Sequence, residues 1–95
     1  MSQLLIVEFF VKDQASATTI WDILGGRQRA MKEAGCHKFE RYVDQDDPNH
    51  LVYTAHWTSR GHYDEYLKWA RAQPGDFQAC FASPPRSTWL DEVKI

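Results

Sequence analysis

Aromatic side chains are the most conspicuous candidates for chemistry in this sequence. The 95-residue chain carries 4 Trp, 4 Tyr and 5 Phe, a 14% aromatic share that is large for the modest core so short a chain can bury. Trp57, Tyr63 and Tyr66 lie within one short stretch. Flat rings form walls that suit a planar ligand, and phenolic hydroxyls can hydrogen-bond to its oxygens. The same three residues also suit a packed core, so both readings are open at this point.

Two residues of the expected sheet could carry or hold a proton. His56 has a neutral form available near pH 7, but it alternates with Trp57 and would face the other side of its strand. We therefore favour a polar interface histidine over a catalytic one. Glu8 is the one charge in an apolar run, and it is either a functional acid or base or the ion-pair partner of a cation such as Arg41. The ion pair is favoured, because buried carboxylates are rarely left unpaired.

Arg27 could reach an anionic substrate oxygen if its helix is continuous. Gly25 and Gly26 precede it, and each glycine costs a helix about 1 kcal/mol relative to alanine. A kink or break at this pair would turn Arg27 toward water, which is the expectation that we favour.

The histidines do not predict a metal site. His50, His56 and His62 recur at every sixth position, whereas metal sites usually use tighter pairs with carboxylate or thiolate support. We expect no metal.

Charge and composition exclude several classes of protein. Lys and Arg number 11 against 13 Asp and Glu, a net charge of −2, without the basic excess typical of nucleic-acid binding. No apolar run approaches the ~18 residues of a membrane span, and the first residues do not resemble a signal peptide. Cys36 and Cys80 do not form a disulfide framework. We expect one domain over residues 1–95, in the cytoplasm, with no nucleic-acid or membrane partner.

The elements that must position these side chains follow from the hydrophobic pattern. Strands are expected at 3–12, 36–43, 50–57 and 86–95, and helices at 14–34, from Thr58 or Ser59 to Pro74, and briefly at 76–82. The first strand is apolar on both faces, so something outside the helix layer must cover its second face. Pro84 and Pro85 are expected to act as a breaker before the last strand. The order predicts an α+β, ferredoxin-like βαββαβ fold, with a four-stranded antiparallel sheet and two helices on one face.

Residues 33–57, EAGCHKFERYVDQDDPNHLVYTAHW, resemble a known family. The stretch is similar to the antibiotic biosynthesis monooxygenase domain in three features. These are the Gly-Cys pair where the second strand begins, the Asp-Asp-Pro-Asn turn, and a Trp at the end of the third strand that is followed by a helix. That family belongs to the dimeric α+β barrel group. The resemblance implies a homodimer that packs sheet against sheet, with a pocket in each copy between its sheet and its helices.

The resemblance also implies site residues. Trp57 and Tyr63 are spaced like the aromatic pair that lines the pocket of the family's polyketide oxygenases. Those enzymes have an Asn four residues before the Trp, where this chain has Tyr53. The haem-degrading branch needs a His ten residues after the Trp, where this chain has Leu67, so no haem and no other cofactor is expected.

The leading hypothesis is a cofactor-independent monooxygenase that combines molecular oxygen with a small phenolic, quinol or anthrone-type substrate. Trp57, Tyr63, Tyr53 and His56 are the catalytic candidates. The substrate-binding candidates are Tyr66, Phe10, Glu8 and Arg27. Two alternatives are a non-catalytic ligand-binding or stress-linked dimer, and an isomerase or cyclase of the same fold.

Overall fold

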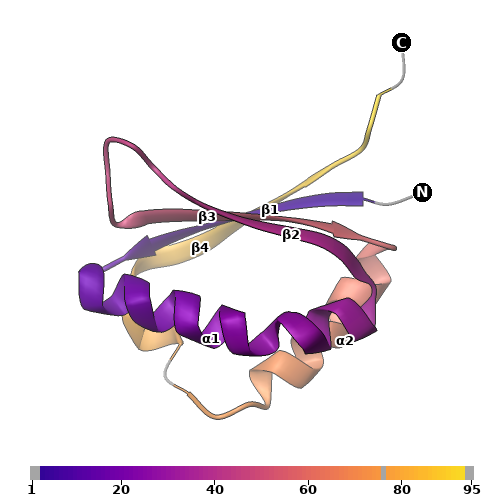
Figure 1. Cartoon of the computed structure of the whole chain (residues 1–95), viewed down its shortest axis with the longest axis horizontal. Coiled ribbons are helices and arrows are strands. Elements are labelled where there is room, and N and C mark those ends of the chain that lie inside the picture. Colours follow the sequence, from indigo (N-terminus) through magenta and orange to yellow (C-terminus); the bar gives the residue numbers. More distant parts are fainter. Residues whose placement is uncertain (1–2, 76, 94–95) are drawn as a thin grey trace.

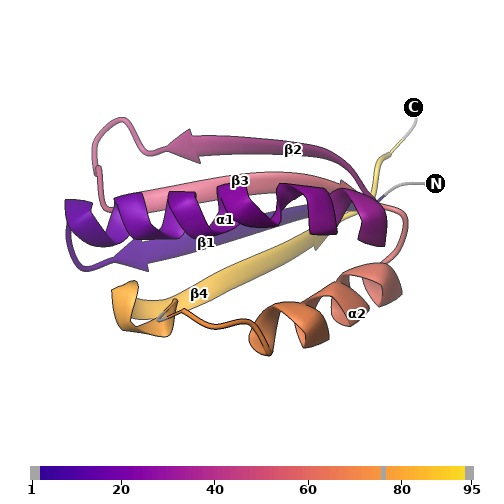
Figure 2. The same cartoon turned by 60° about the horizontal axis from the view of Figure 1, so that its bottom comes forward.

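The computed structural model describes residues 3–75 and 77–93 and has the predicted βαββαβ order. The elements are β1 (Gln3–Val11), α1 (Gln14–Ala34), β2 (Cys36–Val43), β3 (His50–Trp57), α2 (Arg60–Arg71), the short 3₁₀ turn η1 (Gln78–Cys80) and β4 (Phe81–Leu90). All four strands form one antiparallel sheet in the order β2-β3-β1-β4. Both helices lie on the same face of this sheet (Figure 1, Figure 2). The predicted ferredoxin-like α+β fold is therefore confirmed.

Helix α1 begins and ends where the sequence signals place it. The Asp13 side chain accepts a hydrogen bond of 2.8 Å from the Ser16 N–H at the start of the helix. At the other end Gly35 has φ 118°, in the left-handed region that favours glycine. The expected kink at Gly25 and Gly26 is wrong, because α1 is one continuous helix. Both glycines are exposed, so buried residues before and after them hold the helix against the sheet.

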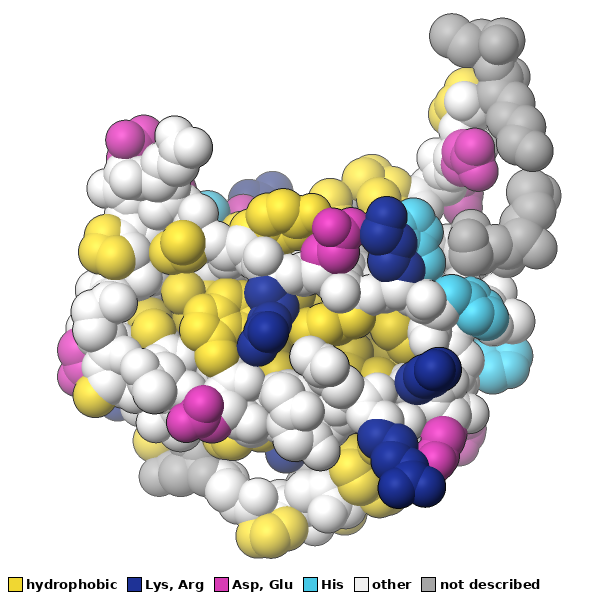
Figure 3. Space-filling model, in the orientation of Figure 1, with side chains coloured by type: hydrophobic (Ala, Val, Ile, Leu, Met, Phe, Trp, Pro, Cys, Tyr) yellow, Lys and Arg dark blue, Asp and Glu magenta, His cyan; other side chains and the backbone are white. Residues whose placement is uncertain are grey.

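The helix-facing side of the sheet carries the core. Alternate residues of β1 and β3 are buried there, as period-two side-chain geometry requires. They pack on buried residues of both helices. The core residues from these elements are Leu5, Val7, Phe9, Val11, Leu51, Tyr53, Ala55, Trp57, Ala17, Ile20, Leu24, Met31, Tyr63, Tyr66 and Ala70. Hydrophobic side chains also show at the surface between α1 and the sheet, with charged side chains scattered among them (Figure 3).

The last strand differs from its predicted position. β4 starts at Phe81 and runs through Pro84 and Pro85 instead of starting after them. Glu8 pairs with Arg86 while Phe10 pairs with Ser83, so the two prolines fall at a register shift. An edge strand with a bulge tolerates proline because no ladder N–H is needed there.

Other parts of the C-terminal prediction also change. The strand ends at Leu90, and residues 94–95 of the predicted strand lie outside the described residues. The helix expected at 76–82 is reduced to η1, and Asp76 lies outside the described residues.

The other face of the sheet has no helix over it (Figure 1, Figure 2). Leu4, Ile6, Glu8 and Phe10 of β1 lie on this face and are half-buried. No helix in the described part of the chain is long and apolar enough to cross a membrane.

Candidate active site

A cavity of about 680 Å³ lies between the sheet and the helices. Its inner walls come from buried residues of β1, β3, α1 and α2, and its outer rim from exposed residues of α2, η1 and β4. The lining residues are Val7, Phe9, Leu24, Arg27, Tyr53, Tyr63, Tyr66, Leu67, Ala70, Arg71, Phe77, Gln78, Phe81, Ala82, Ser83, Pro84, Pro85 and Ser87. Ligand pockets typically measure about 300–1,000 Å³ and are largely apolar with a few polar groups. This cavity fits that description.

Three tyrosines supply most of the polar groups at the buried end of the cavity. Tyr53 comes from β3, and Tyr63 and Tyr66 come from α2; their side chains are buried. Tyr53 and Tyr63 are joined by a side-chain hydrogen bond, and Arg27 donates one to Tyr66. The helical spacing of Tyr63 and Tyr66 places both rings on the side of α2 that faces the sheet.

Burial keeps these tyrosines protonated. Desolvation raises the pKa of Tyr53 well above its usual value, and the hydrogen bond to Tyr63 raises it further. Desolvation also raises the pKa of Tyr63 and of Tyr66, although Arg71 and Arg27 respectively oppose this. At neutral pH the three hydroxyls are therefore not ionised. They can donate hydrogen bonds to a ligand, but they do not act as bases.

Trp57 lies behind the tyrosines and not at the cavity wall. Its side chain is fully buried, at 0% exposure, and its ring centroid is 5.2 Å from that of Tyr63 and 5.4 Å from that of Tyr66. The indole N–H has no hydrogen-bond partner among the described residues. Trp57 therefore acts on the cavity by supporting two of its walls.

Arg27 reaches the cavity, contrary to the favoured expectation that it would turn to water. Because α1 continues through the glycine pair, Arg27 stays on the side of the helix that faces α2 and η1. Its guanidinium carbon lies 5.6 Å from the centre of the Phe77 ring. Arg71 joins it in the lining and was not predicted. Its position, four residues after Leu67 and eight after Tyr63 on the same helix, was the available signal.

Three of the predicted site residues lie on the opposite face of the sheet. His56, Phe10 and Glu8 alternate with the buried residues of their strands, so the backbone turns them away from the cavity. They are separated from it by the sheet and do not line it. The geometry therefore does not bring them together with the tyrosines.

Glu8 has partners other than the predicted Arg41. A Glu8 carboxylate oxygen lies 3.0 Å from His50 Nε2, and the other lies 3.9 Å from Arg86 Nε. The Nδ1 of His50 lies 2.9 Å from Asp44. Hydrogen bonds to these two carboxylates raise the pKa of His50, with Asp44 the larger cause. Arg41 instead lies over the Trp21 ring, 6.0 Å from its centre.

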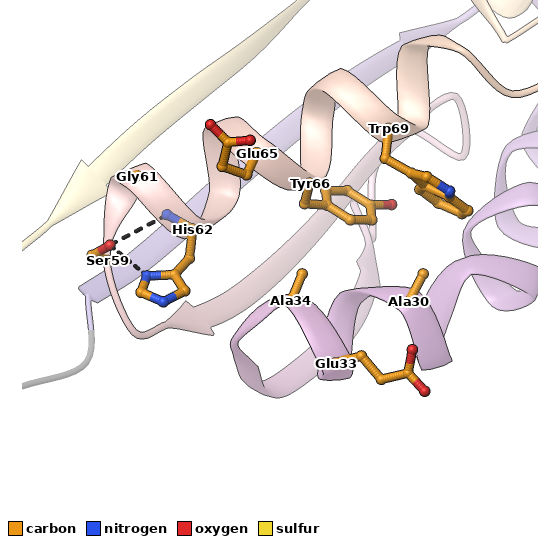
Figure 4. Close-up of a pocket in the computed structure, with 9 residues that line it drawn as sticks. All are labelled: Ala30, Glu33, Ala34, Ser59, Gly61, His62, Glu65, Tyr66 and Trp69. Carbon is orange, nitrogen blue, oxygen red and sulfur yellow. Dashed lines mark hydrogen bonds between the residues drawn. The ribbon is translucent and has the colours of Figure 1, made fainter.

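A second hollow, of about 600 Å³, lies between α1 and α2 and contains Ser59 and His62 (Figure 4). Ser59 Oγ lies 2.7 Å from His62 Nδ1 and also accepts the His62 backbone N–H at 3.2 Å. Ser59 thus caps α2. The carboxylates of Glu33 and Glu65 point away from the imidazole (Figure 4). This pair is explained by helix capping, and the tyrosine-lined cavity remains the candidate site.

The comparisons with known proteins concern both sequence and fold. The family model described as antibiotic biosynthesis monooxygenase matches residues 3–80. No curated protein sequence matches the chain.

Several solved structures share the fold. Rv0793 from Mycobacterium tuberculosis has a TM-score of 0.75 at 17% identity, over 100% of this chain and 98% of that chain. A conserved protein from Methanosarcina mazei Go1 has a TM-score of 0.77 at 13% identity, over 98% and 94% of the two chains. A variant of SnoaB, a cofactor-independent oxygenase from Streptomyces nogalater, has a TM-score of 0.72 at 15% identity, over 99% and 95%. At these identities the structural likeness concerns the fold alone.

Proposed function

The chain belongs to the antibiotic biosynthesis monooxygenase family, and from this premise we propose that it is a cofactor-independent monooxygenase for a flat phenolic, quinol or anthrone-type substrate. The observation that carries the proposal is the cavity itself. It has an apolar, aromatic lining, and buried hydroxyls of Tyr53, Tyr63 and Tyr66 at its inner end. SnoaB, which shares the fold, is a cofactor-independent oxygenase.

The proposed role of the cavity is to bind, orient and stabilise the substrate. Aromatic and aliphatic walls hold a flat ring out of water. Hydroxyls at fixed positions donate to oxygens on which negative charge develops, an effect that is stronger away from water. Tyr66, held by Arg27, and the Tyr53–Tyr63 pair are the proposed donors. Trp57 keeps the rings of Tyr63 and Tyr66 in place.

The proposed reaction balances without a cofactor. An anthrone-type substrate has a CH₂ group opposite its carbonyl, and its deprotonated form is electron-rich enough to reduce oxygen directly. One oxygen atom of O₂ becomes a new carbonyl at that carbon, and the other leaves as water with the two hydrogens. The substrate loses four electrons and O₂ gains four.

The proposed assembly is a homodimer in which the uncovered sheet faces pack together. Leu4, Ile6 and Phe10 on this face are apolar and only half-buried in the single chain. A two-fold dimer would bury the same patch of both copies. We further propose that residues 1–95 act as one domain in the cytoplasm, a location that suits a free thiol such as that of Cys36.

An isomerase or cyclase is less well supported by this cavity. Such an enzyme needs an acid–base pair, and the described lining contains no His, Asp or Glu. A non-catalytic ligand-binding protein could use the same walls. Turnover separates that alternative from the proposed function.

The test is oxygen consumption with a simple anthrone, with ¹⁸O₂ used to follow the label into the quinone. We expect uptake of one O₂ per substrate and one labelled oxygen in the product. Y63F should lower kcat/KM by about tenfold or more, because a donor to the developing oxyanion is lost. Y42F is the matched control, since Tyr42 is 48% exposed and lies on β2 outside the cavity lining. Binding without oxygen uptake would refute the oxygenase and favour the binding protein.

A further inference from the structure

The described lining of the cavity carries positive charge. Arg27 and Arg71 are the charged side chains among its described lining residues. Neither makes an ion pair with a carboxylate in the part of the chain that the structure describes, whereas Arg29 and Arg86 are paired with Glu33 and Glu8. Two guanidinium groups therefore face a cavity that contains no described counter-charge.

The two cations already act on the hydroxyls at the inner end. Arg27 lowers the pKa of Tyr66 through its charge and a hydrogen bond, and the charge of Arg71 lowers the pKa of Tyr63. The centroids of these two tyrosine rings lie 6.3 Å apart. An anionic oxygen placed near them would feel both cations, and Arg27 is already held in place by Tyr66 and by the face of Phe77. Guanidinium groups suit such recognition, because they stay charged and hydrogen-bond well to anionic oxygens.

Among the described residues that line the cavity, none has a side chain that would take a proton from the substrate at neutral pH. Burial holds the tyrosines in their neutral form, and arginine does not lose its proton in proteins. His56 and Glu8 lie on the other face of the sheet. A neutral phenol or enol would enter a site that stabilises its anion but does not deprotonate it.

We infer that the cavity selects its aromatic substrate as a preformed anion, a phenolate or enolate whose oxygen is held by Arg27 and Arg71. The O–H or C–H bond breaks before binding, its electron pair stays on the substrate, and the proton goes to water or buffer. This inference rests on the proposed function in taking the cavity as the substrate site. It adds a substrate class, acidic phenols and enols, and assigns Arg71 as a specificity-determining residue.

The test uses 4-nitrophenol, because its ionised form is yellow and its ionisation occurs close to neutral pH. The absorbance of the bound probe is titrated against pH with saturating protein. We expect its apparent pKa to fall by about one unit on binding, which corresponds to a tenfold preference for the anion. R27Q and R71Q should each lose much of this shift. R29Q is the matched control, since Arg29 lies on the same helix, is exposed and does not line the cavity.

R27K guards against a purely structural effect of losing Arg27. It keeps the positive charge and should retain most of the shift, while circular dichroism checks that each variant folds. An unchanged or raised probe pKa, no binding of the probe, or an equal loss in R29Q would each overturn the inference. The readout does not need turnover. A preference for the anion without oxygen uptake would refute the proposed oxygenase function but not this inference. Oxygen uptake without a preference for the anion would refute this inference but not the proposed function.

Discussion

Replacing the two hydrogen-bonded tyrosines separately and together tests the geometry of the cavity's inner end. In Y53F, Tyr63 loses its hydrogen-bond partner, and we expect a cost of about 1 kcal/mol, the net value of a typical hydrogen bond. Y63F should cost more, about 1–3 kcal/mol, because it leaves the deeper hydroxyl of Tyr53 buried without that partner. The double variant should cost about 1 kcal/mol less than the sum, because the shared bond is lost only once.

Urea unfolding followed by tryptophan fluorescence measures these free energies. For a domain of this size, about 1 kcal/mol corresponds to a shift of about 4–8 °C in Tm, so a thermal scan provides a second measurement. Y42F removes a hydroxyl from an exposed tyrosine and should stay within about 0.5 kcal/mol of the parent protein. If Y53F and Y63F add within about 0.3 kcal/mol, the two hydroxyls do not interact and the proposed donor pair is wrong.

Three other predictions concern stability and assembly. The carboxylate partners of His50 raise its pKa. The contribution of His50 to stability is therefore complete below about pH 6.5 and is lost as the pH rises through the folded-state pKa. E8Q should lower that pKa in an NMR titration, and an unchanged pKa would refute the contact between Glu8 and His50. G35A should lower the free energy of unfolding, measured by urea denaturation, by about 1–2 kcal/mol, because Gly35 has φ 118° and an added Cβ would lie 3.2 Å from the His62 ring. An unchanged midpoint of urea unfolding would contradict this. I6K should shift a dimer to monomer in analytical ultracentrifugation, and a monomeric parent protein would refute the proposed assembly.

The sequence predicts the fold well where its patterns are local. The alternation of β1 and β3 and the stripe of Tyr63, Tyr66 and Ala70 lead directly to the observed elements. The helix caps at Asp13 and Gly35 also follow directly from the residue types at these positions. Helix propensity misled at Gly25 and Gly26, because the packing of neighbouring residues on the sheet outweighs the local cost of glycine.

Contacts between distant segments were harder to predict, on both faces of the sheet, because they depend on the register of the strands. His50 and Glu8 are 42 residues apart in sequence, and their contact follows from the pairing of β1 with β3. The rim of the cavity comes largely from β4, whose start was hidden because Pro84 and Pro85 were interpreted as a breaker. Residue type and the family resemblance pointed to Tyr53, Tyr63 and Tyr66, and all three line the cavity, although their role there stays a prediction. For Arg27 the favoured expectation was wrong, because it depended on a kink that the continuous helix α1 does not have.

The two prolines of β4 also affect whether strands from other molecules can pair with this edge of the sheet. β4 is an outer strand of the sheet, and an exposed strand edge can template the addition of strands from other molecules. Pro84 and Pro85 have no N–H to offer an incoming chain, and the bulge that contains them bends the edge. The addition of further strands along this edge is thereby disfavoured.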